Sequence, residues 1–170
     1  MLRFHEALEP LMRPAKGIYP DPDNWNQGDV DEIIASILRN GCYRPIIANK
    51  DGMILAGHHL YAALLELGAV MVPVVHLDVD RVTARRISFA DNLIASLARP
   101  DEMKMLEGLR WLQENDTSLS GTGSSEDAIE KLAARLLAEQ EEPLHFDDET
   151  LENTVVCPNC GHSWDTKKGH

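Results

Sequence analysis

Two adjacent histidines are the residues of this 170-residue chain whose types and spacing most directly suggest chemistry. His58 and His59 follow the short apolar run 53–56 and Gly57, and they precede the Ala- and Leu-rich segment 60–68. A glycine between a strand and a helix permits close approach to the backbone, and the first N–H groups of the helix attract anions. Neutral imidazoles there can act as a general base, bind phosphate or bind a metal. The alternative is that one histidine caps the helix while the other faces solvent.

A pair of cysteines near the C-terminus is the second chemical feature. Cys157 and Cys160 form a Cys-Pro-Asn-Cys-Gly turn, which is typical of a zinc knuckle. A structural Zn²⁺ site needs four ligands, and we predict His162 and His170 as the next two, with His145 as another candidate. The alternative is a tail with free thiols.

The segments around the histidines predict a small sheet covered by helices. Hydrophobic residues at 30, 33, 34, 37 and 38 share one helical face, with Asp29 as the N-cap and Gly41 as the stop. Asp51-Gly52 lies between two apolar runs and predicts a hairpin. The Val-rich run 70–77 predicts a strand, in which Pro73 indicates an edge position or a bulge.

Three further helices are predicted after this sheet. Residues 80–98 form the first, with Val82, Phe89 and Leu93 spaced for one face. Residues 99–115 and 126–142 form the others. The last of these resembles the first helix of a helix-turn-helix, but no second helix follows it, so specific DNA reading is not predicted. The fold class is therefore α+β, with a small mixed sheet, flanking helices, a helical extension and a short tail.

The net charge of −12 is unevenly distributed. Residues 1–100 carry 12 acidic and 10 basic side chains, whereas residues 101–170 carry 16 acidic and 6 basic ones. Because the second part repels a phosphate backbone, a nucleic acid is expected to contact residues 1–100. The acidic C-terminal part is expected to pack, to self-associate or to bind a protein partner. No stretch is typical of a signal peptide or a membrane span, and a cytoplasmic location is expected.

The order of the motifs resembles the N-terminal domain of the ParB/sulfiredoxin superfamily, in particular members from phages or members associated with DNA methylation. The resemblance covers residues 20–112. In chain order, the matching pieces are the loop 20–24, Ile33, Ser36-Ile37, Gly41, Pro45-Ile46, Gly52, Gly57, Ala62-Ala63, Leu67-Gly68, Val72-Pro73-Val74 and the box 90–102. Members of this superfamily bind CTP with magnesium and load onto DNA, or act as nucleases, as kinases of small molecules or as sulfinic-acid reductases.

The resemblance implies a nucleotide- or phosphate-binding site, and the residues expected in it can be named one by one. We predict Gly57, His58, His59, Tyr61, Asn24, Asp91 and Asn92 for binding, with His58 and His59 as catalytic residues and Asp91-Asn92 as the position that helps to hold Mg²⁺. The chain departs from partitioning members, which have Gly-Glu-Arg-Arg at the turn, because it has Gly57-His58-His59-Leu60 and thus lacks the paired guanidinium groups. The turn also lacks the cysteine of a reductase, and Cys42 is expected to be a small buried residue.

Two functions follow as hypotheses. The first is a nucleotide-dependent, DNA-associated factor or nuclease; as an enzyme it would be a nuclease, an NTP hydrolase or a phosphotransferase. The second is a non-catalytic adaptor whose acidic helices and Cys/His tail bind protein partners. The expected domains are an arm (1–20), the ParB-like domain (21–99), an acidic helical extension (100–142, with a linker at 116–125) and a connector with the tail (143–170).

Overall fold

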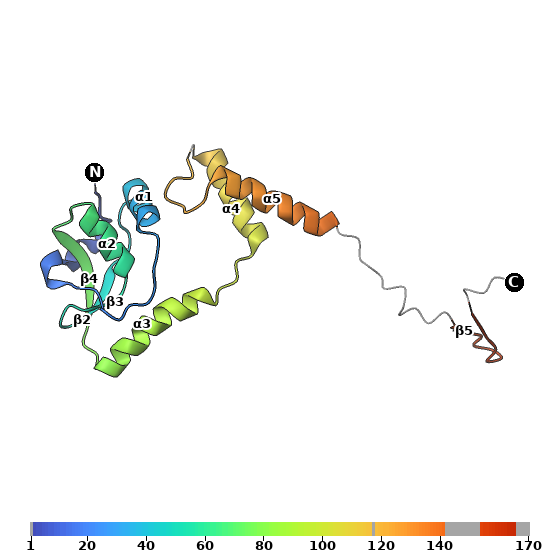
Figure 1. The fold of residues 1–170 in the computed structure, drawn as a ribbon. Helices are drawn as coiled ribbons and strands as arrows, with labels where there is room; N and C mark the ends of the chain where they lie inside the picture. Colours follow the sequence, from blue (N-terminus) through green and yellow to red (C-terminus); the bar gives the residue numbers. More distant parts are fainter. Residues whose placement is uncertain (1, 117, 142–153, 166–170) are drawn as a thin grey trace. The chain divides into compact units, whose positions relative to one another are not determined.

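The structure, a computed structural model, describes residues 2–116, 118–141 and 154–165 (Figure 1). It divides into two compact units, Met1–Ala133 and Ala134–His170. In chain order, the elements are η1 (Glu6–Leu11), β1 (Met12–Pro14), η2 (Ala15–Gly17), α1 (Val30–Asn40), β2 (Ile46–Asn49), β3 (Ile54–Ala56), α2 (His58–Glu66), β4 (Met71–Leu77), α3 (Arg81–Ser96), α4 (Glu102–Asn115), α5 (Glu126–Glu141), β5 (Thr154–Val156) and β6 (Ser163–Asp165). The domain boundaries expected from the sequence stay a prediction.

A four-stranded mixed sheet in the order β1-β4-β2-β3 forms the centre of the first unit. β4 runs parallel to β2, while the β1–β4 and β2–β3 pairs are antiparallel. The predicted β2–β3 hairpin is confirmed. Gly52 in its turn has a φ of 95°, and a Cβ there would lie 2.1 Å from the carbonyl oxygen of Gly17. The mixed α+β fold expected from the sequence is thus present.

Pro73 does not mark an edge strand, because β4 lies between β1 and β2. Its position nevertheless has a physical reason. β1 pairs with residues 71–73 of β4, ending at Met12 opposite Pro73, and β2 pairs with residues 74–77, beginning at Ile46 opposite Val74. The proline therefore lies where β4 changes partner, and this is a point where a missing N–H is tolerated within an inner strand.

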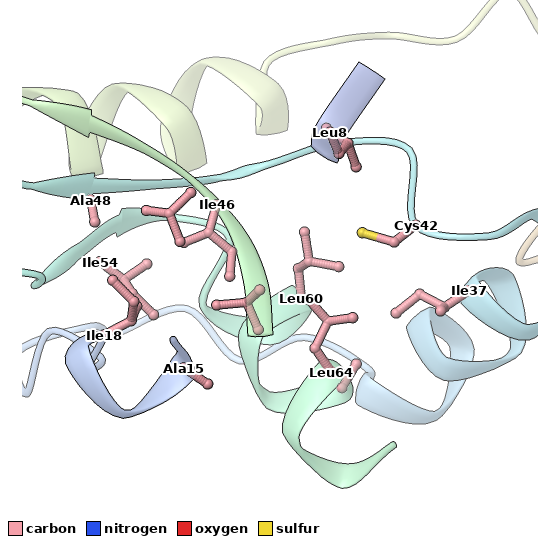
Figure 2. Packing of buried hydrophobic residues seen from close by; sticks show 13 residues of the cluster. Leu8, Ala15, Ile18, Ile37, Cys42, Ile46, Ala48, Ile54, Leu60 and Leu64 are labelled. Carbon is pink, nitrogen blue, oxygen red and sulfur yellow. The ribbon is translucent and has the colours of Figure 1, made fainter. Parts of the chain in front are cut away.

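The hydrophobic core lies between the sheet and the helices α1 and α2 (Figure 2). Its fully or nearly fully buried members include Ile46, Ala48 and Ile54 from the strands, Ile37 from α1, and Leu60, Ala63 and Leu64 from α2. Cys42 belongs to the same cluster and is 2% exposed, as expected, and burial raises the pKa of its thiol. The predicted caps of α1 are also confirmed, because the Asp29 side chain accepts from the Glu32 N–H and Gly41 has a φ of 81°.

Helix α3 contacts the sheet through β3. Successive residues of a strand point to opposite faces, so Leu55, which is 1% exposed, faces away from the core that contains Ile54. The apolar stripe predicted for α3 does not form a buried face, since Val82 and Leu93 are 61% and 48% exposed. Its buried residues are Ala84 and Ser88 instead.

The second unit contains the antiparallel β5–β6 hairpin, in which Val155 lies opposite Trp164. Helix α5 runs across the boundary between the two units. Among the helices that the structure describes, none combines the length and the hydropathy that a membrane span requires.

Candidate functional site

The start of helix α2 offers backbone N–H groups to a ligand. Gly57 is the N-cap residue, has a φ of 92° and supplies no side chain to cap the helix. The first helical hydrogen bond runs from the N–H of Tyr61 to the carbonyl oxygen of Gly57 at 2.9 Å. The N–H groups of residues 58–60 therefore precede the first internal bond, and such groups attract anions.

Both histidines of this turn hold the polar loop 21–28. The Nε2 atom of His58 accepts a hydrogen bond from the backbone N–H of Asp21 at 3.2 Å. The Nε2 atom of His59 accepts one from the backbone N–H of Gly28 at 2.8 Å. A backbone amide can only donate, so the Nε2 atom of His58 carries no proton in this arrangement. The Nε2 atom of His59 also lies 3.2 Å from the carbonyl oxygen of Asn26. Neither ring caps α2, and the predicted catalytic role of both residues stays a prediction.

Burial reinforces the neutral state of His58. Desolvation lowers the pKa of this imidazole below its ordinary value, whereas the carboxylates of Asp21 and Asp91 act to raise it and His59 acts to lower it further. The net direction is downward. Only the neutral ring of His58 can accept the hydrogen bond from the Asp21 N–H. The lowered pKa and this hydrogen bond therefore favour the same geometry of the loop.

Helix α3 holds the other side of the same loop. Residues Arg85, Phe89 and Asn92 lie at spacings of four and three, which places them on one helical face. Arg85 forms an ion pair with Asp21 at 3.0 Å and with Asp23 at 3.4 Å. The loop 21–28 is therefore fixed between α2 and α3.

Two further contacts between that face and the loop are an aromatic pair and an amide pair. The rings of Trp25 and Phe89 have their centroids 6.3 Å apart. The Nδ2 group of Asn26 donates to Oδ1 of Asn92 at 2.6 Å. Asn92 in turn donates to the carbonyl oxygen of Ser88 at 3.0 Å, so its amide is already engaged at both ends.

A cleft of about 330 Å³ lies where these elements meet. It brings together six of the predicted site residues: Asn24, Gly57, His58, His59, Asp91 and Asn92. Tyr61 does not line it. Its hydroxyl group donates instead to the carbonyl oxygen of Ile18 at 2.7 Å, and the side chain packs against the core. The larger cavity of the first unit, about 620 Å³, is mostly apolar and lies between β3 and α3. We take the smaller cleft as the candidate site because the polar groups converge there.

Sequence reasoning missed two residues of the cleft, Arg44 and Asn26. Arg44 directly precedes Pro45 and β2, and its guanidinium group forms no ion pair or hydrogen bond within the described residues. Arg44 could have been predicted as a site residue because it precedes β2, and β2 is the hairpin partner of the strand that leads into Gly57. The charged groups that line the cleft are thus the Arg44 guanidinium and the Asp91 carboxylate, together with the partial positive charge of the helix N-terminus.

The predicted zinc ligands lie partly outside the described residues. Cys157 and Cys160 are free thiols in the turn between β5 and β6, and His162 ends that turn. His170 and His145 fall outside residues 2–116, 118–141 and 154–165. Within those ranges no group of three or more His, Cys, Asp or Glu side chains is arranged to hold a metal ion.

Solved structures of ParB proteins are similar to this chain, whereas no family model and no curated protein matches it. The C-terminally truncated chromosome-partitioning protein ParB from Caulobacter crescentus, complexed with CTP-gamma-S, superposes with a TM-score of 0.60 at 19% identity, over 75% of this chain and 77% of that one. The same protein complexed to the centromeric parS site gives 0.41 at 16% identity, over 72% and 64% of the two chains. A Pnob8-like ParB-N domain gives 0.44 at 16% identity, over 91% and 55%. The chain therefore has a ParB-like fold.

Proposed function

We propose that this chain binds a nucleoside triphosphate in the cleft at the start of α2 and acts in a DNA-related process. The observation that carries the proposal is that one cleft combines the uncapped N–H groups of residues 58–60 with the guanidinium group of Arg44, which has no ion pair or hydrogen bond among the described residues. Oriented N–H groups and an arginine are the groups that proteins commonly use to bind phosphates. The likeness to a ParB structure that holds CTP-gamma-S supports the choice of a nucleotide.

Magnesium fits this site through Asp91. The carboxylate of Asp91 lines the cleft, is exposed and has no hydrogen bond or ion pair within the described part of the chain. Mg²⁺ is commonly held by one or two carboxylates together with phosphate oxygens of the ligand. The ion would offset the charge of the triphosphate, which Arg44 alone does not balance. Asn92 is less suited to this role because its amide already braces the loop through Asn26.

His58 and His59 have a positioning role in this proposal. Their rings hold Asp21 and Gly28, the first and last residues of the loop that supplies Asn24 and Asn26 to the cleft. The paired arginines expected at a partitioning-type turn are replaced by groups that bind the protein itself. Nucleotide affinity should therefore depend more on Arg44, the helix N-terminus and Mg²⁺ than on the histidine side chains.

The experiment is a calorimetric titration of the full chain with CTP, ATP and GTP, each with and without Mg²⁺. Saturable binding of one triphosphate supports the proposal. Arg44→Ala should weaken that binding about tenfold or more, the usual cost of losing a charge-assisted hydrogen bond. Arg81→Ala is the matched control, because Arg81 lies on α3 outside the cleft. Assays for nucleotide hydrolysis and DNA cleavage on the same samples then separate a binding protein from an NTP hydrolase or a nuclease.

The DNA-related part of the proposal is supported by basic residues of α3. Arg81 and Arg86 are exposed and form no ion pair within the described residues. They are therefore free to contact a phosphate backbone, whereas Arg85 is engaged with Asp21. Binding of duplex DNA should weaken steeply with added salt and should weaken further in an Arg81→Ala/Arg86→Ala variant. If the variant binds DNA as well as the original chain does, α3 is not the DNA contact.

A non-catalytic adaptor is the second candidate, and exposed apolar residues favour it. Ile94 and Leu97 at the end of α3 are 67% and 77% exposed, and Trp111 of the acidic helix α4 is 60% exposed. Large exposed apolar side chains are candidates for contacts with a protein partner. If the folded chain binds none of the three triphosphates, the adaptor becomes the better explanation.

A further inference from the structure

The larger cavity of the first unit, between β3 and α3, has the size of a small-molecule site. Its volume is about 620 Å³, within the range of about 300–1,000 Å³ that is usual for ligand pockets. Leu55 of β3 and Ala84 of α3 line it and are 1% and 3% exposed. Buried apolar side chains from both elements thus form part of its wall.

Other apolar side chains of the same cavity are left in contact with water. Val82 and Phe89 of α3 are 61% and 39% exposed, and Met53, which precedes β3, is half-buried. A ligand with an apolar body would cover these side chains and remove their surface from water, which favours binding. The lining therefore suits a ligand that is largely apolar.

The charged residues of the cavity are three arginines and two aspartates, a surplus of one positive charge. Arg85 serves both carboxylates, since it pairs with Asp21 at 3.0 Å and with Asp23 at 3.4 Å. Its guanidinium group also lies over the Phe89 ring, 5.4 Å from the ring centroid. Arg85 is thus engaged by the protein itself.

Arg81 and Arg86 are the two arginines that remain for a ligand. Both line the cavity and are exposed, and neither forms a hydrogen bond or an ion pair among the described residues. Such a guanidinium group can bind a carboxylate, sulfonate or phosphate group through charge-assisted hydrogen bonds. The cavity is therefore complementary to a molecule that joins an apolar body to an anionic group.

We propose that this cavity binds a small organic anion with an apolar body. The body lies against Leu55, Val82 and Phe89. The anionic group, a carboxylate, sulfonate or phosphate, contacts Arg81 or Arg86. The cavity shares no lining residue with the cleft at the start of α2, so the proposal does not depend on nucleotide binding.

Two matched dyes test this proposal on the purified full chain, without DNA or nucleotide. Anilinonaphthalene sulfonate carries an anionic group, whereas N-phenylnaphthylamine has the same rings without the charge, and both fluoresce more strongly outside water. We expect one sulfonate dye to bind per chain, about tenfold more tightly than the neutral dye, the usual gain from a charge-assisted hydrogen bond. The absence of saturable binding, or the binding of several dyes per chain, would overturn the proposal.

Val82→Glu locates the dye. The new carboxylate would lie in the cavity, repel the sulfonate and offer Arg86 a partner four residues away, so the affinity should fall about tenfold or more. Val70→Glu is the matched control, because Val70 is 80% exposed, lies outside the cavity and receives the same charge. Circular dichroism checks that both variants are folded. Equal dye affinity in the two variants would overturn the proposal.

An Arg81→Ala/Arg86→Ala variant tests the contact with the anionic group. Its affinity for the sulfonate dye should fall to about that for the neutral dye, while the affinity for the neutral dye should not change, because the apolar wall is intact. An unchanged preference for the sulfonate would show that other groups recognise the charge. An equal loss of both dyes would show that the arginines do not distinguish them. Either result would contradict the proposed contact.

Discussion

The imidazole of His59 accepts a hydrogen bond from the backbone N–H of Gly28, so the first turn of α2 holds a loop that lies 31 residues earlier in the chain. His58 does the same for Asp21. The two neighbouring rings thus hold both ends of the loop 21–28. The histidine pair that first suggested catalysis is, in the structure, the attachment of the loop that forms one wall of the cleft.

Gly28→Ala should detach this loop. A Cβ at residue 28 would lie 2.8 Å from Nδ1 of His59 and 3.0 Å from its Cγ and Cε1, so the ring must move and lose its hydrogen bond. We expect a loss of about 1–2 kcal/mol in the free energy of unfolding, measured by urea denaturation. Gly17→Ala is the control, because no atom lies within 4 Å of a Cβ there. Equal stability of the two variants would contradict the role of the His59 contact.

His58 should make stability depend on pH. Burial lowers its pKa in the folded state, so the unfolded chain binds the proton more readily. Its stabilising contribution is complete above the ordinary histidine pKa of about 6.5 and is lost as the pH falls through the lowered value of the folded state. The urea midpoint should therefore fall between pH 7.5 and pH 5. This fall should be smaller in His58→Gln, whose amide oxygen can still accept from Asp21; an identical pH profile would show that His58 does not contribute.

Arg85→Met should destabilise the chain through Asp21. The Asp21 side chain is only 6% exposed, and the substitution removes its charged partner. Arg85 itself is 44% exposed, and solvent screens the pair in part. We therefore expect a loss of about 1–3 kcal/mol, less than for a fully buried pair.

Two further variants test this explanation. Arg86 is the exposed neighbour of Arg85, and Arg86→Met should change the free energy of unfolding by less than about 0.5 kcal/mol. Asp21→Asn combined with Arg85→Met should cost less than the sum of the single changes, because the uncompensated carboxylate is gone. Strictly additive effects would mean that the two side chains do not interact.

Asp91→Asn should change nucleotide binding in opposite directions with and without Mg²⁺. Without the ion the carboxylate repels phosphate, so the variant should bind the triphosphate as well as the original chain or better. With Mg²⁺ the original chain should gain affinity and the variant should gain less. Calorimetry with and without the ion measures both effects, and Asp51→Asn in the β2–β3 turn is the control. If Mg²⁺ raises the nucleotide affinity equally in the original chain and in both variants, Asp91 is not a ligand of the ion.

The sequence predicts this fold well where the deciding interactions are local. The Asp29 cap, the Gly41 stop and the Asp51-Gly52 turn each depend on residues within a few positions of one another, and the structure confirms all three. Pro73 was misjudged because its partners, Met12 and Ile46, belong to strands far away in the chain. Local patterns carry no information about which strand pairs with which half of β4.

The candidate site was predictable in its location but less so in its detail. Gly57 and Asp91 come together as expected. The partners of His58 and Arg85, by contrast, are backbone and side-chain groups of Asp21, 37 and 64 residues away. The apolar spacing of α3 predicted a packed face, yet Leu93 is 48% exposed, because periodicity shows that residues share a face and not what covers it.

The proposed function requires that the N–H groups at the start of α2 bind the phosphates of a nucleotide. The most direct measurement is a ¹H–¹⁵N correlation spectrum of the labelled chain, recorded during a titration with CTP and Mg²⁺ and compared with cytidine. We expect saturable shifts of the backbone amides of His58, His59 and Leu60 and of the Arg44 side chain with the triphosphate, and far smaller shifts with the nucleoside. Shifts confined to other residues, or equal shifts with both ligands, would contradict this mode of binding.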